Sequence, residues 1–242
     1  MDILSIGNSF SEDAQRYLHG IAKADKVQLK CFNLYIGGCP LSKHYRNMLS
    51  EERAYNLGMN GEFTDFKVSI KEALLNRTWD IVTNQQVSSE SPYYETYQPY
   101  LNKLIEYVRL CVPKAKIVIH QTWAYEDDSN RLNVELGYKN SAEMFKDIKA
   151  SYEKAAKEIN ADMTIPSGEL FQKLVSSGIK KIHRDTYHAS YGLGRYALGL
   201  LWYKMLTGND ITDNTFADFD EEITENEITI AKKCVNEVCA SH

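Results

Sequence analysis

Short apolar runs rich in β-branched residues alternate along this chain with longer amphipathic stretches. This alternation is typical of βαβ units, in which parallel strands form a sheet and the intervening helices cover its faces. We therefore predict an α/β fold, with a three-layer α/β/α sandwich around a parallel sheet. The predicted strands are residues 2–6, 28–35, 79–84, 116–121 and 161–165. The predicted helices are residues 12–24, 67–76, 97–111, 141–159, 168–176, 191–206 and 221–239.

The apolar positions within these segments agree with that arrangement. The segments 12–24 and 141–159 are amphipathic, so each would cover one face of the sheet. The runs at 81–82 and 117–119 are apolar on both faces, as sandwiched parallel strands are. Residues 40–66 follow no strong period, and we expect a long loop with a helical piece there, of the kind that borders functional sites.

The first predicted strand ends at Gly7-Asn8-Ser9, directly before a predicted helix. In open α/β sheets, ligands bind at the carboxyl ends of the strands. The backbone N–H groups at the start of the following helix favour negative charge in the same place. Ser9 is therefore a candidate nucleophile. The alternative is that Ser9 or Ser11 only caps the helix.

Asp185 and His188 lie three residues apart, just before a strongly apolar segment. With this spacing the carboxylate can meet one imidazole nitrogen, and the other nitrogen can take the proton of a serine. We predict His188 as the general base and Asp185 as the residue that orients it. His120, near the end of the fourth strand, is the main alternative base.

Polar groups that follow the second and third strands are candidates for stabilising an oxyanion. A glycine at position 38 lets a backbone N–H approach a ligand closely, and a side-chain amide is a neutral donor. A glycine N–H after the second strand and a side-chain amide of Gln85 or Gln86 are therefore candidate donors to an oxyanion. Because side chains alternate along a strand, only one of Gln85 and Gln86 would face the site.

A further group of residues is predicted to contact the substrate. Its members are Asn8, Gln86, Trp123 and Tyr125. The two aromatic side chains follow the fourth strand, where an aromatic face can stack on a sugar ring or an acyl group. The alternative is that they are core aromatics beneath a loop. The adjacent acidic run Glu126-Asp127-Asp128 lacks the spaced partners of a metal shell, so we predict no metal site.

Four segments of the chain resemble the motif blocks of the SGNH hydrolase superfamily, also called GDSL-like esterases, and more closely a bacterial family of proposed acetylhydrolases, DUF4886. The segments are Gly7-Asn8-Ser9-Phe10-Ser11, Gly37-Gly38-Cys39-Pro40-Leu41, the run from Trp79 to Ser88, and Asp185-Thr186-Tyr187-His188. The resemblance spans essentially the whole chain. It implies a flavodoxin-like sandwich with a five-stranded parallel sheet in the spatial order 2-1-3-4-5.

The resemblance also implies roles for residues, with two departures from the usual pattern. Ser9 would be the nucleophile, His188 the base and Asp185 the residue that orients it. The N–H groups of Ser9 and Gly38, with the side chain of Gln85, would form the oxyanion hole. Asn8 stands where the superfamily usually has aspartate. The third block lacks the common Gly-x-Asn-Asp sequence, whose asparagine donates to the oxyanion, and Gln85 takes that place.

From these residues we expect a serine esterase that hydrolyses small acyl esters, acetyl esters on carbohydrate above all, through an acyl-enzyme intermediate. No metal or organic cofactor is expected. One alternative is a non-catalytic carbohydrate-binding protein on the same fold. Another is a lipase or thioesterase, which the absence of a long apolar lid segment disfavours.

The charge and hydropathy of the chain limit the classes of partner that it is expected to bind. With a net charge of −5 and scattered Lys and Arg residues, a nucleic-acid partner is not expected. No apolar run reaches the length of a membrane span, so no membrane partner is expected either. No linker-like segment divides the chain, so residues 1–242 are predicted to form one domain. The location is expected to be cytoplasmic, or periplasmic or secreted if an export leader was removed. The expected partner is a small-molecule or carbohydrate ester, and the oligomeric state stays open.

Overall fold

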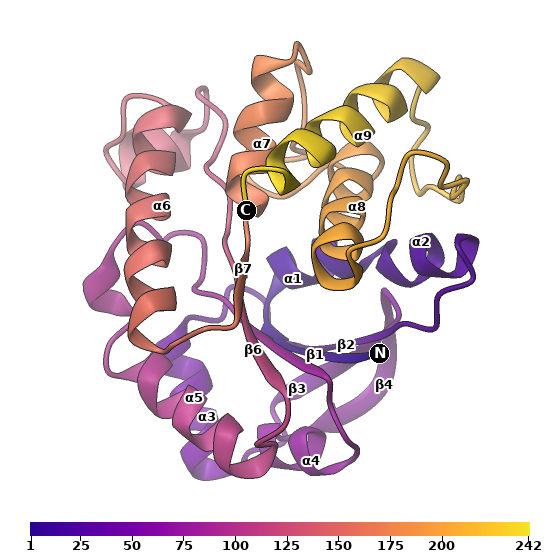
Figure 1. Cartoon of the computed structure of the whole chain (residues 1–242). Coiled ribbons are helices and arrows are strands. Elements are labelled where there is room, and N and C mark those ends of the chain that lie inside the picture. Colours follow the sequence, from indigo (N-terminus) through magenta and orange to yellow (C-terminus); the bar gives the residue numbers. More distant parts are fainter.

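The computed structural model describes residues 1–242 and contains a seven-stranded sheet with helices on both sides (Figure 1). The spatial order of the strands is β4-β3-β2-β1-β5-β6-β7. The strands are β1 (Asp2–Gly7), β2 (Lys30–Tyr35), β3 (Tyr55–Met59), β4 (Glu62–Val68), β5 (Ile81–Asn84), β6 (Lys116–His120) and β7 (Met163–Ile165). The five predicted strands are β2, β1, β5, β6 and β7 in space. They are parallel to one another and have the expected order 2-1-3-4-5.

The prediction of a five-stranded, wholly parallel sheet is wrong at one edge. There β3 and β4 form an antiparallel hairpin, and β3 also pairs antiparallel with β2. Both strands lie in residues 40–68, most of which we expected to form a loop. β3 is short and partly buried and β4 is largely exposed, so neither has the apolar run of a buried strand. Asn60 and Gly61 form the turn between them, and both residues have positive φ. An Asn-Gly dipeptide is a hairpin signal, which a search for hydrophobic periodicity does not detect.

Nine α-helices and two short turns accompany the sheet. The helices are α1 (Ser9–Gln15), α2 (Leu18–Ala24), α3 (Leu41–Ser50), α4 (Ile70–Leu75), α5 (Tyr100–Cys111), α6 (Ser141–Glu158), α7 (Ser167–Ser176), α8 (Leu193–Thr207) and α9 (Glu225–Cys239). A 3₁₀ turn, η1, spans Tyr94–Thr96 and a π turn, η2, spans Arg131–Glu135. The helix predicted at 12–24 is divided in two, because the chain turns at Arg16 and Tyr17.

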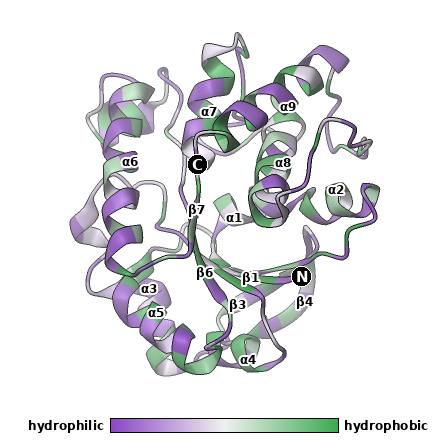
Figure 2. Cartoon of the chain, in the orientation of Figure 1, coloured by the Kyte–Doolittle hydropathy of each residue, from purple (hydrophilic) through white to green (hydrophobic).

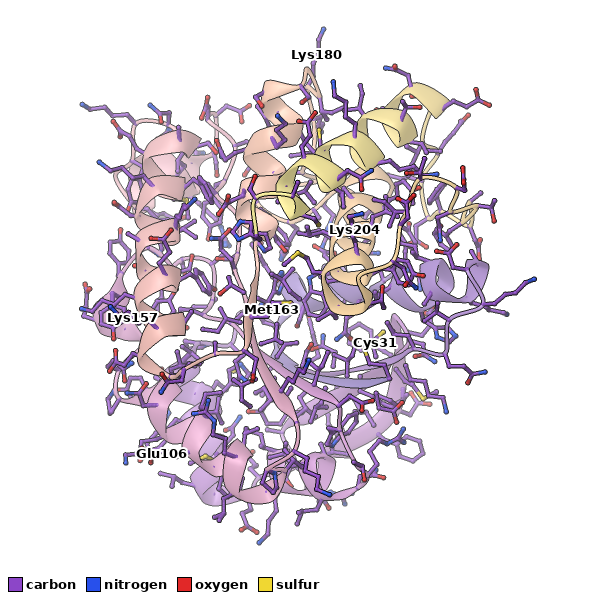
Figure 3. The ribbon with its side chains drawn as sticks, viewed as in Figure 1. Cys31, Glu106, Lys157, Met163, Lys180 and Lys204 are labelled. Atoms are coloured by element: carbon purple, nitrogen blue, oxygen red, sulfur yellow. The ribbon has the colours of Figure 1, made fainter.

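The helices form two layers that enclose the sheet. Helices α1, α2, α7, α8 and α9 pack together on one face, and α3, α4 and α5 pack together on the other (Figure 1). Helix α8 carries apolar residues around its whole circumference, seen as green bands among white and purple ones in Figure 2, and its residues 193–203 are buried. Such a helix belongs inside a protein. In Figure 3 Lys180 projects away from the molecule, whereas the side chain of Cys31 lies in the interior.

No helix is both long and apolar enough to cross a bilayer. No group of three or more His, Cys, Asp or Glu side chains is arranged to hold a metal ion.

Candidate active site

Ser9 lies at the junction of β1 and α1. The side chain of Asn8 caps the helix by accepting a hydrogen bond from the N–H of Phe10 at 3.0 Å. The Ser11 hydroxyl accepts from the N–H of Asn8 at 3.1 Å and completes a capping box. Gly7 permits this tight junction, because a Cβ there would overlap the Ser11 hydroxyl. Ser9 is therefore not the cap, and its hydroxyl is available for other contacts.

Three side chains form a continuous hydrogen-bonded chain at this junction. Nε2 of His188 lies 2.8 Å from Oγ of Ser9, and Nδ1 of His188 lies 2.7 Å from Oδ2 of Asp185. The second carboxylate oxygen accepts from the backbone N–H of His188 at 2.8 Å. Burial raises the pKa of Asp185, but the hydrogen bonds from the His188 ring and backbone outweigh it and lower the pKa overall. A charged Asp185 holds the imidazole with its Nδ1–H donating, which leaves Nε2 as the acceptor for the serine proton.

Two residues of the site, Ser9 and Gly38, have backbone N–H groups without a hydrogen-bond partner. Ser9 is the first residue of α1, so its N–H has no partner within the helix. Gly38 has φ of +59°, which favours glycine, and its N–H donates to no backbone or side-chain acceptor. Both residues line the same cleft. Both N–H groups are thus free of other partners, as donors in an oxyanion hole must be.

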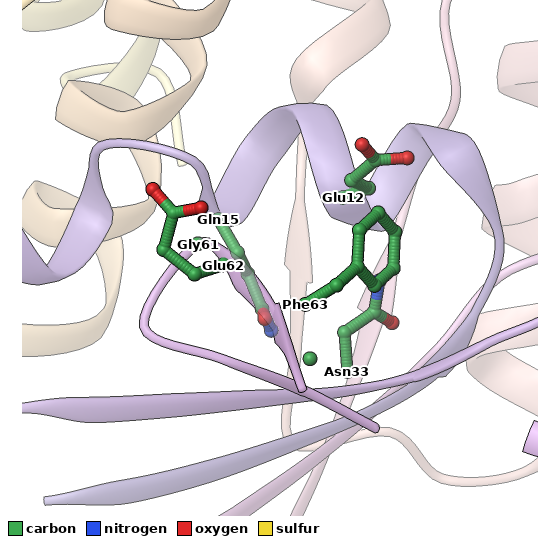
Figure 4. A pocket seen from close by; sticks show the side chains of 7 residues that line it. Glu12, Gln15, Asn33, Gly61, Glu62 and Phe63 are labelled. Carbon is green, nitrogen blue, oxygen red and sulfur yellow. The ribbon is translucent and has the colours of Figure 1, made fainter. Parts of the chain in front are cut away.

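The cleft has a volume of about 500 Å³, large enough for a small ester. Its walls are mainly polar. The lining residues are Asn8, Ser9, Phe10, Glu12, Tyr35, Gly37, Gly38, Val87, Ser88, Ser89, Arg131, Arg184, Tyr187 and His188. Glu12 also lines a second, smaller hollow, together with Phe63 (Figure 4). At about 10 Å³ it has room for one water molecule at most, so the larger cleft is the candidate site.

Neither Gln85, the predicted oxyanion donor, nor Gln86, a predicted substrate contact, lines the cleft. Gln85 is buried beneath it, where its Nε2 donates to Oδ1 of Asn8 at 2.7 Å and its Oε1 lies 2.7 Å from Nδ1 of His120. Gln86 is buried as well, and its Oε1 accepts from the N–H of Leu41 at 2.9 Å. Buried amides need such partners. Gln85 thus supports Asn8, which does line the cleft, instead of facing Ser9 itself.

Trp123 and Tyr125 also lie outside the cleft, contrary to their prediction as a substrate wall. Trp123 is fully buried and stacks on Phe10, with ring centres 4.0 Å apart. Tyr125 is buried, and its hydroxyl is hydrogen-bonded to that of Ser88 at 2.8 Å. Both are core aromatics, the alternative that the sequence left open. The aromatic residues that line the cleft are Phe10, Tyr35 and Tyr187, none of which the sequence singled out.

His120, the alternative base, lies in the interior. Its Nε2 is 3.0 Å from Oγ of Ser167, and its Nδ1 meets Gln85 as described above. Complete burial lowers the pKa of His120 to about 3, so the ring is neutral. A neutral ring donates from Nδ1 to Gln85 and accepts from the Ser167 hydroxyl. His120 therefore supports the loop that carries the nucleophile, and does not contact Ser9.

The buried, neutral His120 predicts a specific acid sensitivity. The unfolded imidazole has a pKa of about 6.5, so between about pH 6.5 and 3 the unfolded state binds a proton that the folded state does not. Stability is therefore expected to fall as the pH falls through this window. In His120→Asn, the slope of the unfolding free energy against pH should decrease by up to about 1.4 kcal/mol per pH unit. Urea denaturation at several pH values measures this slope. An unchanged slope, equal to that of the exposed-terminus control His242→Asn, would contradict the assignment.

A buried aspartate that was not predicted from the sequence connects the helix that begins at Ser9 with the segment that carries His188. Asp13 is fully buried in α1 and accepts hydrogen bonds from Nη1 of Arg184 at 2.9 and 3.0 Å and from Nε of Arg195 at 2.8 Å. The N–H of Ala189 donates to it at 3.1 Å. Arg184 and Ala189 flank the turn that carries Asp185 and His188. Asp13 therefore joins this turn to the helix of Ser9.

One sequence signal could have found Asp13. It follows Ser9 by four residues, so the two share a helix face. An acidic residue on the face of a nucleophile is a candidate for orienting the groups around it.

A serine, a histidine and an aspartate meet at the carboxyl edge of this α/β sheet, and the fold is the one seen in structures of SGNH and GDSL-like hydrolases. The chain belongs to the DUF4886 family, described as "Domain of unknown function (DUF4886)", which matches residues 2–238. It is similar to the crystal structure of a DUF4886 family protein from Bacteroides uniformis, with 31% identity and a TM-score of 0.93 over 99% of this chain and 95% of that one.

More distant structures share the fold. A candidate SGNH hydrolase from Slackia heliotrinireducens is 22% identical, with a TM-score of 0.62 over 85% of this chain and 98% of that one. A variant of an acetyl-xylooligosaccharide esterase from Geobacillus stearmophilus is 13% identical, with a TM-score of 0.52 over 85% and 91% of the two chains. A search of curated proteins finds no match.

Proposed function

We propose that this protein is a serine esterase that hydrolyses small acyl esters, acetyl esters on carbohydrate above all, through an acyl-enzyme intermediate. The observation that carries the proposal is the hydrogen-bonded chain from Oγ of Ser9 through His188 to Asp185, at 2.8 and 2.7 Å. These distances are those of a nucleophile beside its base and of a base beside its orienting carboxylate.

The geometry supports the following reaction. Oγ of Ser9 attacks the ester carbonyl while Nε2 of His188 takes its proton, and Asp185 stabilises the imidazolium that forms. The carbonyl oxygen becomes an oxyanion that the N–H groups of Ser9 and Gly38 stabilise, each worth about 3 kcal/mol. His188 then gives the proton to the departing alcohol. A water molecule, activated by His188 in turn, attacks the acyl-enzyme, so the acid and the free serine are released.

Two features support a short acyl group on a polar alcohol. The cleft is lined mainly by polar groups and backbone. No continuous apolar groove for a long acyl chain extends from Ser9 in that lining. The acetyl-xylooligosaccharide esterase that shares the fold adds support for acetyl groups on a carbohydrate.

The acyl chain length tests this proposal. We expect kcat/KM for p-nitrophenyl acetate to exceed that for the octanoate ester by at least about tenfold, because a polar cleft gains nothing from added methylenes. Initial rates with the acetate, butyrate and octanoate esters measure this preference. A preference for octanoate would favour the lipase or thioesterase alternative. No turnover, together with no labelling of Ser9 by a fluorophosphonate, would favour the non-catalytic binding protein.

A further inference from the structure

An arginine without an acidic partner lies in the wall of the cleft beside the candidate base. Arg131 begins the π turn η2 and lines the cleft. Its guanidinium carbon lies 4.1 Å from the ring centre of Tyr187, and that ring lies 4.0 Å from the imidazole of His188. The ring of Tyr187 therefore lies between the guanidinium of Arg131 and the imidazole of His188.

The other arginines around the site are neutralised. Arg184 and Arg195 share the buried carboxylate of Asp13, and Arg195 and Arg16 share Asp220. Arg131 forms no ion pair, although acidic residues are close to it in sequence. Its hydrogen-bond partner within the protein is the neutral hydroxyl of Tyr125, which leaves its charge uncompensated. One of these, Asp127, accepts instead from the N–H of Ser141 at 2.6 Å. The positive charge of Arg131 is therefore available to a ligand.

The stacking on Tyr187 determines how Arg131 can bind. A guanidinium that rests one face on an aromatic ring keeps its in-plane N–H donors free at the edge. Two parallel N–H groups match the two oxygens of a carboxylate, sulfate or phosphate. Glu12 is the sole acidic residue in the cleft lining. Burial, the largest cause, raises the pKa of Glu12, and Arg195 lies 3.7 Å from its carboxylate. The cleft therefore presents an available cation and no free, fully exposed anion.

We propose that the natural substrate is an ester that carries an oxyanion group, such as the carboxylate of an acidic sugar, and that Arg131 binds this group bidentately beside the scissile bond. The inference rests on the proposed esterase function and specifies its substrate class. Arg131 is a specificity residue here, because it would hold the substrate and take no part in proton transfer.

Matched acetyl esters test the charge requirement. The anionic set is para-acetoxybenzoate, para-acetoxybenzenesulfonate and para-acetoxyphenyl phosphate, and para-acetoxybenzamide is the neutral counterpart. Arg131→Met keeps an unbranched side chain and removes the charge. We expect it to lower kcat/KM for the preferred anionic ester on the order of tenfold, as for loss of a charged hydrogen bond, and for the amide less than about twofold. Comparing variant with wild type for each ester cancels differences between leaving groups. The three anions identify which oxyanion group is preferred.

Two further variants sharpen the result. Arg131→Lys keeps the charge without the planar fork, so it should recover part of the preference. Arg53→Met removes an exposed arginine that pairs with Glu72 away from the cleft, and it should behave as wild type. Added salt should reduce the wild-type preference. Equal losses on anionic and neutral esters, or no loss on any, would overturn the inference while the esterase activity stands.

Absence of turnover on every ester would instead contradict the proposed function. The binding site can then still be tested by calorimetry with para-hydroxybenzoate and para-hydroxybenzamide. Tighter binding of the benzoate that is lost in Arg131→Met would support the anion site. Equal binding of the two, or binding that Arg131→Met leaves unchanged, would overturn it.

Discussion

Replacing Ser9 by alanine is expected to lower kcat for p-nitrophenyl acetate by roughly 10⁴- to 10⁶-fold, because no other side chain can form the acyl-enzyme. The Ser9 hydroxyl makes its hydrogen bond to His188 alone, so its loss leaves the core and the helix cap intact. Steady-state rates, with circular dichroism as a check of folding, measure this effect. Ser176→Ala, in which the lost hydroxyl bonds only its own helix at an exposed position, is the matched control.

The same experiment distinguishes a working triad from a coincidental cluster. His188→Ala should lose nearly as much activity as Ser9→Ala, and the double variant should lose little more, because the residues act as one unit. Ser9→Ala that retained wild-type turnover would remove the basis of the mechanism. Multiplicative losses in the double variant would show that Ser9 and His188 act independently.

Replacing Asp13 by alanine is expected to lower the free energy of unfolding by about 3–5 kcal/mol, because it leaves the buried ends of Arg184 and Arg195 without their shared carboxylate. The N–H of Ala189 loses its acceptor as well. Urea denaturation measures the stability. Because Asp13 anchors the turn of His188 to the helix of Ser9, kcat should fall even at temperatures where the variant stays folded.

Two further variants distinguish the effect of losing the Asp13 carboxylate from the effect of losing any ion pair in the same network. Asp13→Asn keeps acceptor oxygen in place and should be less destabilising than Asp13→Ala, which guards against a variant that does not fold at all. Glu62→Gln removes an outer, largely exposed partner of Arg16 in the same network and should cost no more than about 1 kcal/mol. If Asp13→Ala unfolded at the wild-type urea concentration, the anchoring role would be rejected.

The sequence predicted the central fold well because that part of the pattern is local. Buried parallel strands such as β1 and β6 require apolar residues on both faces, so their runs stand out from polar surroundings. Strand β4 is mostly exposed, and no apolar pattern marks it. Strand β4 pairs with the free edge of β3, whose other edge pairs with β2. Hydrophobic periodicity gives no information about such pairing.

The candidate site divides in the same way. Asp185 and His188 are three residues apart, so their pairing could be inferred from spacing. The position of Ser9 after a strand and before a helix could be inferred too. Which side chains face the cleft could not be inferred. Gln85, Trp123 and Tyr125 follow strands as expected, yet all three are buried in the folded chain. Residues such as Arg131 and Tyr187 line the cleft instead.

The five parallel strands and the three candidate catalytic side chains could be predicted from the sequence, because motifs and periods are short-range properties. The strand order followed from the family resemblance. In the structure Ser9 and His188 meet across 179 residues of sequence, as predicted, but the role of Asp13 in joining their two segments is visible in the folded chain alone. The physical reason is burial: a fully buried carboxylate must collect its donors from wherever packing brings them. That packing depends on the whole core, and no short segment specifies it.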